Sequence, residues 1–195
     1  CVHGDVVESF THGAVALRDS LLGPLYLVFQ EVISPYEQAA SFMLNYNTEL
    51  MCSENVAFSQ PYYSRHPWIH LKRNEVKAFL KCYYNAVSSL SDRETFTFLE
   101  HEFEASSPHK THEEGWFLME TRWMLYMEDE NVLRILPGIP RKWMENGKTI
   151  SIRNAASYFG KFSIFTESRL DEGYIKAVIE CRTERKPQKV EIRLP

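Results

Sequence analysis

The sequence predicts an α+β protein in which the helices come first along the chain and the strands follow. Before about residue 130, apolar residues recur at three- and four-residue steps, which is the period of a helix face. After that point the period changes to two, as in half-buried strands. Helices and strands that are segregated in this way indicate α+β rather than alternating α/β architecture. We therefore expect a helical region at 1–130 and an antiparallel β-sandwich domain at 131–195.

Apolar stripes and local start signals predict four helices in the first region. Pro24 should kink or break the first of them, because proline lacks the backbone N–H that a helix interior needs. Ser34 is a good N-cap, and Pro35 suits the first position of the second helix. The last helix is apolar nearly all round, so we expect it to be buried on most sides. The predicted ranges are 14–32, 34–51, 74–87 and 113–127.

Alternating apolar residues predict five short antiparallel strands in the second region, which would make a small sandwich or part of one. Turn sequences separate the runs, among them Asn146-Gly147, Phe159-Gly160 and Asp171-Glu172-Gly173. The predicted strands are 132–136, 148–153, 161–167, 174–180 and 189–194.

Composition narrows the range of partners. The 195 residues include 22 basic and 26 acidic side chains, a net charge of −4, and this argues against nucleic acid as a partner. The apolar runs fall far short of the roughly 18 residues of a membrane span. The four cysteines form no C-x-x-C pair, and we expect neither a metal nor a cofactor. The compartment is not indicated, and the start at Cys1 is consistent with a processed chain or a fragment.

Aromatic residues make up 13% of the chain, and many of them stand beside polar residues. Sugar-binding clefts have this composition, and so do large cores. The segment from Phe58 to His70 is the clearest example, and its two prolines predict a stiff loop rather than a helix. Its side chains either bind sugar hydroxyls and stack on sugar faces or plug the core. Pro67 also weakens any metal chelation by His66 and His70 in helical geometry.

The densest polar cluster is Glu100-His101-Glu102 followed by 109–114. Three interpretations are open. The acids at 113 and 114 suit the start of a helix, where the helix dipole favours negative charge, and Glu100 is then solvated. A metal site would use His109, His112 and Glu113, although the spacing matches no zinc motif. The third interpretation is a pair of carboxylates for acid–base hydrolysis of a glycosidic bond.

Two stretches resemble a known family of glycoside hydrolases. The sequences T-F-T-F-L-E-H (95–101) and P-H-K-T-H-E-E-G-W-F-L-M (108–119) look like the last hairpin of an (α/α) six-hairpin barrel. The sequences V-L-R-I-L-P-G-I-P-R-K-W (132–143) and N-A-A-S-Y-F-G-K-F-S (154–163) resemble the β-sandwich that follows such barrels. The nearest relatives by this resemblance are α-L-rhamnosidase-like and α-L-fucosidase-like enzymes and uncharacterised bacterial homologues.

The resemblance implies roles for particular residues. In rhamnosidase-like enzymes a late T-x-W-E segment carries an active-centre Glu, and Glu100 matches it, with Leu99 in place of the Trp. Glu100 would then be the general base. His112 would contact the sugar, and Glu113 would be a second active-centre carboxylate. The substrate-binding set implied alongside them is Gln60, Tyr62, Tyr63, His66, Trp68 and His101.

The resemblance also implies a larger protein. In such barrels the general acid comes from an earlier hairpin, so we expect it in a part of the polypeptide upstream of Cys1. The isolated chain should then be inactive, and missing hairpins should leave Tyr83, Trp116 and Trp123 under-covered. The alternative is a module without catalysis that binds carbohydrate or stabilises a larger assembly, in which Gln would replace Glu100 without loss.

Overall fold

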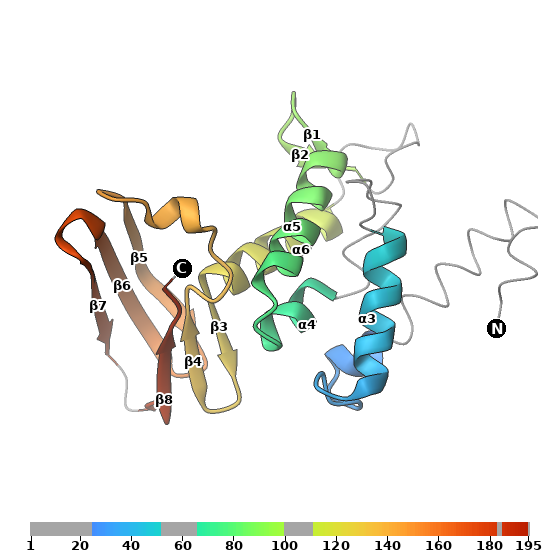
Figure 1. The fold of residues 1–195 in the computed structure, drawn as a ribbon, viewed down its shortest axis with the longest axis horizontal. Helices are drawn as coiled ribbons and strands as arrows, with labels where there is room; N and C mark the ends of the chain where they lie inside the picture. Colours follow the sequence, from blue (N-terminus) through green and yellow to red (C-terminus); the bar gives the residue numbers. More distant parts are fainter. Residues whose placement is uncertain (1–24, 52–65, 100–110, 183–184, 195) are drawn as a thin grey trace, which may run out of the picture. The chain divides into compact units, whose positions relative to one another are not determined.

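The computed structural model of the protein describes residues 25–51, 66–99, 111–182 and 185–194. The chain divides into two compact units, Cys1–Glu120 and Thr121–Pro195, and each is described by itself below. The described residues of the first unit are helical apart from one short strand pair, and those of the second form two three-stranded sheets (Figure 1). The α+β class is therefore confirmed. The predicted domain boundary was at 130, and the division between the compact units falls after Glu120.

The described elements of the helical unit follow a helical stretch at 25–29. They are α3 (Gln38–Met51), α4 (His66–Lys72), α5 (Val76–Leu90), β1 (Ser91–Asp92), β2 (Thr97–Phe98) and α6 (Thr111–Leu125), the last of which continues into the second unit.

The capping interaction predicted at Ser34 is present, but the helix begins later than predicted. The Ser34 Oγ accepts a hydrogen bond from the Tyr36 N–H at 3.3 Å, and Glu37 Oε1 accepts one from the Ser34 N–H at 3.1 Å. The two bonds resemble a capping box, but the Ser34 hydroxyl accepts from the second following N–H rather than the third. Residues 35–37 nevertheless form a turn, so regular helix starts at Gln38.

Helix α4 was not predicted, and the expectation of a loop through His70 was wrong. Residues 58–65 lie outside the described part, but His66–Lys72 is helical, with Pro67 as its second residue. Proline is tolerated there because the first N–H groups of a helix have no intrahelical acceptor. His66 and His70 consequently stand four residues apart on one helix, which the sequence argument had considered unfavourable.

The second half of α5 packs with β2 and the start of α6. Ala86 and Phe98 are buried, and Trp116 and Phe117 pack against them. The ring of Tyr83 lies between neighbours, since its centroid is 5.9 Å from that of Phe79 and 5.7 Å from that of Phe117. The prediction of an uncovered aromatic stripe was therefore wrong for Tyr83, which is 7% exposed, and for Trp123, which is 8% exposed.

Helix α6 differs from its prediction in two respects. Its apolar residues are not all buried, because Leu118 and Met119 are exposed. It also ends at Leu125, before the predicted end at 127, because Tyr126 and Met127 belong to a strand that pairs with 134–135. Cross-strand pairing overrides the helical period of these two apolar residues.

The described residues of the second unit form two three-stranded sheets, whose strands are labelled in Figure 1. One has the order β3-β4-β8 and the other the order β5-β6-β7. The predicted all-antiparallel arrangement was wrong for one pair, because β8 runs parallel to β4, with Val132 opposite Lys189. The bounds are β3 (Tyr126–Asp129), β4 (Val132–Ile135), β5 (Thr149–Ser157), β6 (Gly160–Arg169), β7 (Tyr174–Cys181) and β8 (Lys189–Ile192).

The inner face of the second sheet forms a core with the first sheet. On β6 the side chains at 162, 164, 166 and 168 are buried and those between them are more exposed, as the period of two predicts. The ring of Phe162 meets that of Tyr126 on β3 edge to face, with centroids 4.9 Å apart. The Ser168 hydroxyl donates to the Met144 carbonyl at 2.8 Å, which satisfies a buried polar group.

The segment that resembles the barrel-to-sandwich junction (132–143) is buried in its central part and exposed at 141–143. Residues 133–139 are all buried, and the backbone N–H groups of Leu136 and Gly138 donate to the carbonyls of Leu125 and Met124 at the end of α6. Leu136 has a φ of 56°, in the left-handed region that a bulky residue rarely adopts. Complete burial and two flanking backbone hydrogen bonds hold this conformation.

Candidate functional site

Most of the predicted site residues lie outside the described part of the chain. Glu100, His101, Gln60, Tyr62 and Tyr63 are among them. His66 and His112 lie in α4 and α6, but their side chains are outside the description. The structure therefore describes the side chains of only two members of the predicted set, Trp68 and Glu113.

Trp68 makes core contacts. Its ring meets that of Phe29 edge to face with centroids 5.0 Å apart, and the Lys72 Nζ lies 5.1 Å from its centroid. It also packs against the buried cluster of Leu25, Val28, Ala40, Leu44 and Ile69. This geometry matches the core interpretation of the aromatic residues in this segment, because the ring is only partly open to a ligand.

Glu113 lies in the first turn of α6 and is 1% exposed. An acid at this position is favoured by the helix dipole, which the first of the three interpretations expected. A carboxylate that attacks or protonates a substrate has to reach it. The burial of Glu113 in the first turn of α6 fits the first of the three interpretations, and its role as an active-centre carboxylate stays a prediction.

A polar network that sequence analysis missed connects α4 and α5 to the turn before α3. His70 Nδ1 lies 2.7 Å from Glu75 Oε2, and the Arg73 Nε donates to Glu75 Oε1 at 2.7 Å. The Arg73 Nη1 donates to the Pro35 carbonyl and to the Ser41 Oγ. Burial raises the pKa of the Glu75 carboxyl, but its bonds to His70 and Arg73 outweigh this and hold that pKa below its ordinary value of 4.5.

This network predicts a pH-dependent loss of stability. A carboxyl whose pKa is lower in the folded chain stabilises the fold above its unfolded pKa, and this contribution is lost as the pH falls through the folded value. We expect Glu75→Gln to be less stable than the parent chain near neutral pH, with a difference that shrinks below about pH 4.5. Urea unfolding at several pH values measures it, with the exposed Glu145→Gln as control. A difference that is constant with pH would contradict the assignment.

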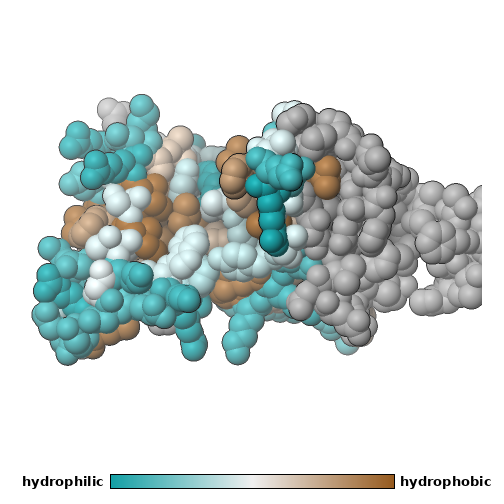
Figure 2. Space-filling view, turned by 90° about the horizontal axis from the view of Figure 1, so that it is seen from above, coloured by the Kyte–Doolittle hydropathy of each residue, from teal (hydrophilic) through white to brown (hydrophobic). Residues whose placement is uncertain are grey.

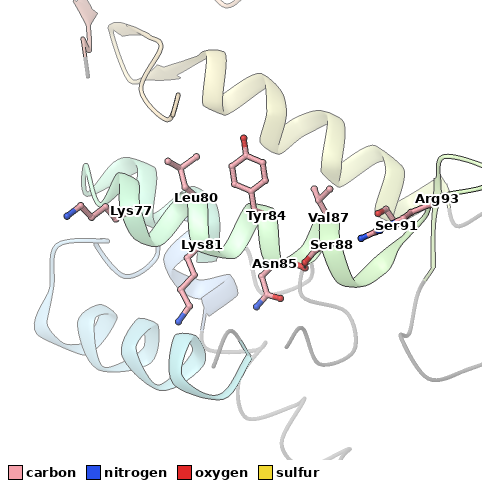
Figure 3. Close-up of a pocket in the computed structure, with 9 residues that line it drawn as sticks. All are labelled: Lys77, Leu80, Lys81, Tyr84, Asn85, Val87, Ser88, Ser91 and Arg93. Atoms are coloured by element: carbon pink, nitrogen blue, oxygen red, sulfur yellow. The ribbon is translucent and has the colours of Figure 1, made fainter. Parts of the chain in front are cut away.

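A groove runs along α5 and continues onto β1 (Figure 3). Its volume is about 790 Å³. In Figure 3 the side chains of Leu80, Tyr84 and Val87 project from one side of the helix, and those of Lys81 and Asn85 project from the other. The lining residues are Lys77, Leu80, Lys81, Tyr84, Asn85, Val87, Ser88, Ser91 and Arg93.

The groove is positively charged. Three of its nine described lining residues are cations, Lys77, Lys81 and Arg93, and none is an acid. The nearest acid in the sequence, Asp92, accepts hydrogen bonds from the N–H groups of Glu94 and Thr95 and so holds the turn after β1. The groove can offer charge, hydroxyl groups and the half-exposed ring of Tyr84 to a ligand.

In the sequence, the segment at the end of the groove is followed by the predicted catalytic acid. Ser91 pairs with Phe98 and Asp92 pairs with Thr97 in the β1–β2 pair. Glu100 follows Phe98 by two residues in the sequence. Sequence analysis missed the groove because it considered only the apolar stripe of α5. The signal for it was two lysines four residues apart in a segment without acids.

The outer face of the β5-β6-β7 sheet is a second candidate surface. Phe165 and Val178 stand opposite each other on it and are both exposed. A bulge between Ile152 and Ala155 interrupts β5 near its middle, where Asn154 has a φ of 52° and donates its N–H to the Ser163 Oγ at 3.0 Å. Two hollows of about 270 and 540 Å³ lie beside the bulge. Figure 2 shows hydrophobic residues among hydrophilic ones over this unit.

The described residues form neither a metal-binding cluster nor a membrane-spanning helix. In 25–51, 66–99, 111–182 and 185–194, no three or more His, Cys, Asp and Glu residues are grouped so that they could hold a metal ion. No helix in the same ranges is both long and apolar enough to span a bilayer. The metal interpretation of His109, His112 and Glu113 includes side chains outside this part.

Comparison with known proteins gave no match: no protein family, no curated protein and no solved structure was found to be similar to the chain.

Proposed function

We propose that the chain is the C-terminal portion of a glycoside hydrolase that cleaves glycosidic bonds with a pair of carboxylates. The observation that supports this most is the groove along α5, which ends at the β1–β2 pair, from which the sequence leads directly to Glu100. An open groove with hydroxyl groups and an aromatic face suits a saccharide, and its hydrolysis needs in addition a carboxylate, the role proposed for Glu100.

In the proposed reaction Glu100 is the general base. It takes a proton from a water molecule, and the water attacks the anomeric carbon. A second carboxylic acid protonates the leaving glycosidic oxygen as the bond breaks. By the resemblance, this acid belongs to the part of the polypeptide upstream of Cys1. The helical unit then contributes the last hairpins of an (α/α) barrel.

The second unit is proposed to be a reduced form of the β-sandwich that follows such barrels. Two observations support this. The inner faces of its sheets meet at Tyr126 and Phe162. The junction sequence at 132–143 forms a buried connection from β4 into the short 3-10 helix Arg141–Met144.

The test is hydrolysis by the natural longer polypeptide that contains this chain, assayed on a panel of aryl glycosides and oligosaccharides. We expect Glu100→Gln to lower kcat by about 10²–10⁴-fold, the usual contribution of a general base, because an amide cannot accept the proton of water. The control is Glu145→Gln, at an exposed position in the second unit, which should leave the rate unchanged. Full activity in the Glu100→Gln variant would remove Glu100 from the mechanism.

A second candidate, carbohydrate binding without cleavage, is favoured by the outer face of the β5-β6-β7 sheet. Exposed Phe165 offers a stacking surface, and Asn154, Ser163 and Glu180 offer hydrogen bonds around it. This candidate predicts saccharide binding that Glu100→Gln leaves intact and no hydrolysis of any glycoside in the same panel.

A further inference from the structure

We propose that the α5 groove binds the carboxylate of an acidic saccharide, so that the substrate class is an oligosaccharide that contains uronic acid. This inference rests on the proposed function, because it assigns a substrate class to the same groove.

The charge of the groove is opposite in sign to the net charge of the chain. The chain as a whole has four more acids than basic residues, 26 against 22, yet the described lining of the groove has three cations and no acid. Two described cations that precede the groove in the sequence are paired with acids. Lys72, the last residue of α4, pairs with Glu31, and Arg73 pairs with Glu75. In the described residues, Lys77, Lys81 and Arg93 are exposed and form no such pair.

The lysines of the groove destabilise α5. Lys77 is the second residue of the helix, where the helix dipole disfavours a positive charge. Lys77 and Lys81 also stand four residues apart, a spacing at which like charges repel. An acid at either position would favour the helix. Local rules are commonly broken in this way at functional sites, where a ligand supplies the missing charge.

The groove also offers neutral groups that suit a sugar ring and its hydroxyls. The ring of Tyr84 is 45% exposed and offers an apolar face to a sugar ring. The hydroxyl of Ser88 donates to the Asn85 carbonyl at 3.0 Å, so its oxygen remains an acceptor for a sugar hydroxyl. Cations, an aromatic face and hydroxyl groups together fit a charged sugar better than a simple inorganic anion, which has no use for the ring.

The groove suits a short acidic saccharide better than a long polyanion. A nucleic acid needs an extended basic surface, and a chain of net charge −4 repels it beyond the groove. A short uronate oligosaccharide carries few charges and can place one of them between Lys77 and Lys81. The ion pairs would be exposed, so their strength should fall as salt is added.

The experiment is a calorimetric titration of the whole chain with trigalacturonate and with its neutral methyl ester. We expect the acid to bind at least about tenfold more tightly than the ester, because charge-assisted hydrogen bonds are stronger than neutral ones. The double variant Lys77→Gln/Lys81→Gln should lose this preference. The control Lys142→Gln/Lys148→Gln, with two exposed lysines in the other unit, should keep it. The variant Lys77→Gln/Lys81→Gln should be at least as thermally stable as the parent chain. Misfolding would then be excluded as the cause of a lost preference for the acid.

Three results would overturn the inference. Equal affinity for acid and ester would remove the charge preference and leave the proposed hydrolase function standing. Binding of inorganic phosphate in the groove as tight as that of trigalacturonate would make the groove a general anion site. If both double variants kept the preference for the acid, the saccharide would bind elsewhere on the chain. Failure of the Glu100→Gln test, in contrast, concerns the hydrolase function alone.

Discussion

Replacing Glu128 with alanine should destabilise the second unit by about 3 kcal/mol, because it removes one partner of a buried ion pair. The Glu128 side chain is 3% exposed, and its oxygens accept hydrogen bonds from the Arg122 Nη2 at 2.7 and 2.8 Å. The Tyr158 N–H also donates to it at 3.0 Å. Burial lowers the pKa of the Arg122 guanidinium, but the hydrogen bond and the attraction to Glu128 raise that pKa overall. The variant would leave this cation and one backbone N–H without their acceptor.

The measurement is urea unfolding of Glu128→Ala beside a matched control. Glu145→Ala removes the same side chain from an exposed position in the same unit and should change the free energy of unfolding by less than about 0.5 kcal/mol. If the two variants were equally stable, neither the Arg122–Glu128 pair between α6 and β3 nor the hydrogen bond from the Tyr158 N–H to Glu128 would contribute to the stability of the fold.

Replacing Phe162 with alanine should cost the second unit about 3–5 kcal/mol. The side chain is 2% exposed and meets Tyr126 of the other sheet, so the change leaves a cavity between the two sheets. Phe165 provides the control on the same strand, three residues further on, where the side chain points to the outer face and is 39% exposed.

The two phenylalanine variants can be compared in one unfolding series. We expect Phe162→Ala to shift the transition strongly and Phe165→Ala to shift it by no more than about 1 kcal/mol. Similar losses in the two variants would mean that both faces of the sheet are covered. The outer face would then be no candidate for a ligand.

Local patterns were sufficient for much of the fold. The alternating residues of 161–167 predicted β6, and the buried face of that strand follows the alternation. The predicted turns at Gly147, Gly160 and Gly173 all have positive φ, the conformation that glycine permits. The apolar stripe from Val76 to Val87 predicted a helix at 74–87, and α5 spans Val76–Leu90 with Glu75 as its N-cap.

Other features depend on contacts that a local pattern does not contain. The parallel pairing of β8 with β4 joins segments more than fifty residues apart. Tyr126 and Met127 continue the period of α6, and only the pairing with β4 assigns them to a strand. Helix α4 has seven residues, too few for a convincing period, and its Pro67 indicated a loop.

The predicted site residues stay predictions, because most of their side chains lie outside the described part of the chain. Glu113 and Trp68 were selected for their chemistry, but the one is buried in a helix turn and the other packs in the core. The charged side of α5 was not selected, since a lysine pair on a helix is ordinary until the structure shows a groove beside it. The prediction for Glu100 still stands on the resemblance and on its place after β2.

The most direct test of a carbohydrate-active function is to follow the backbone amide signals of the chain by NMR during titration with trigalacturonate. We expect the shifts to concentrate between Lys77 and Arg93, along the groove. Shifts confined to the outer face of β5-β6-β7, around Phe165, would favour binding without cleavage. An absence of shifts with this and with neutral oligosaccharides would contradict the carbohydrate assignment itself.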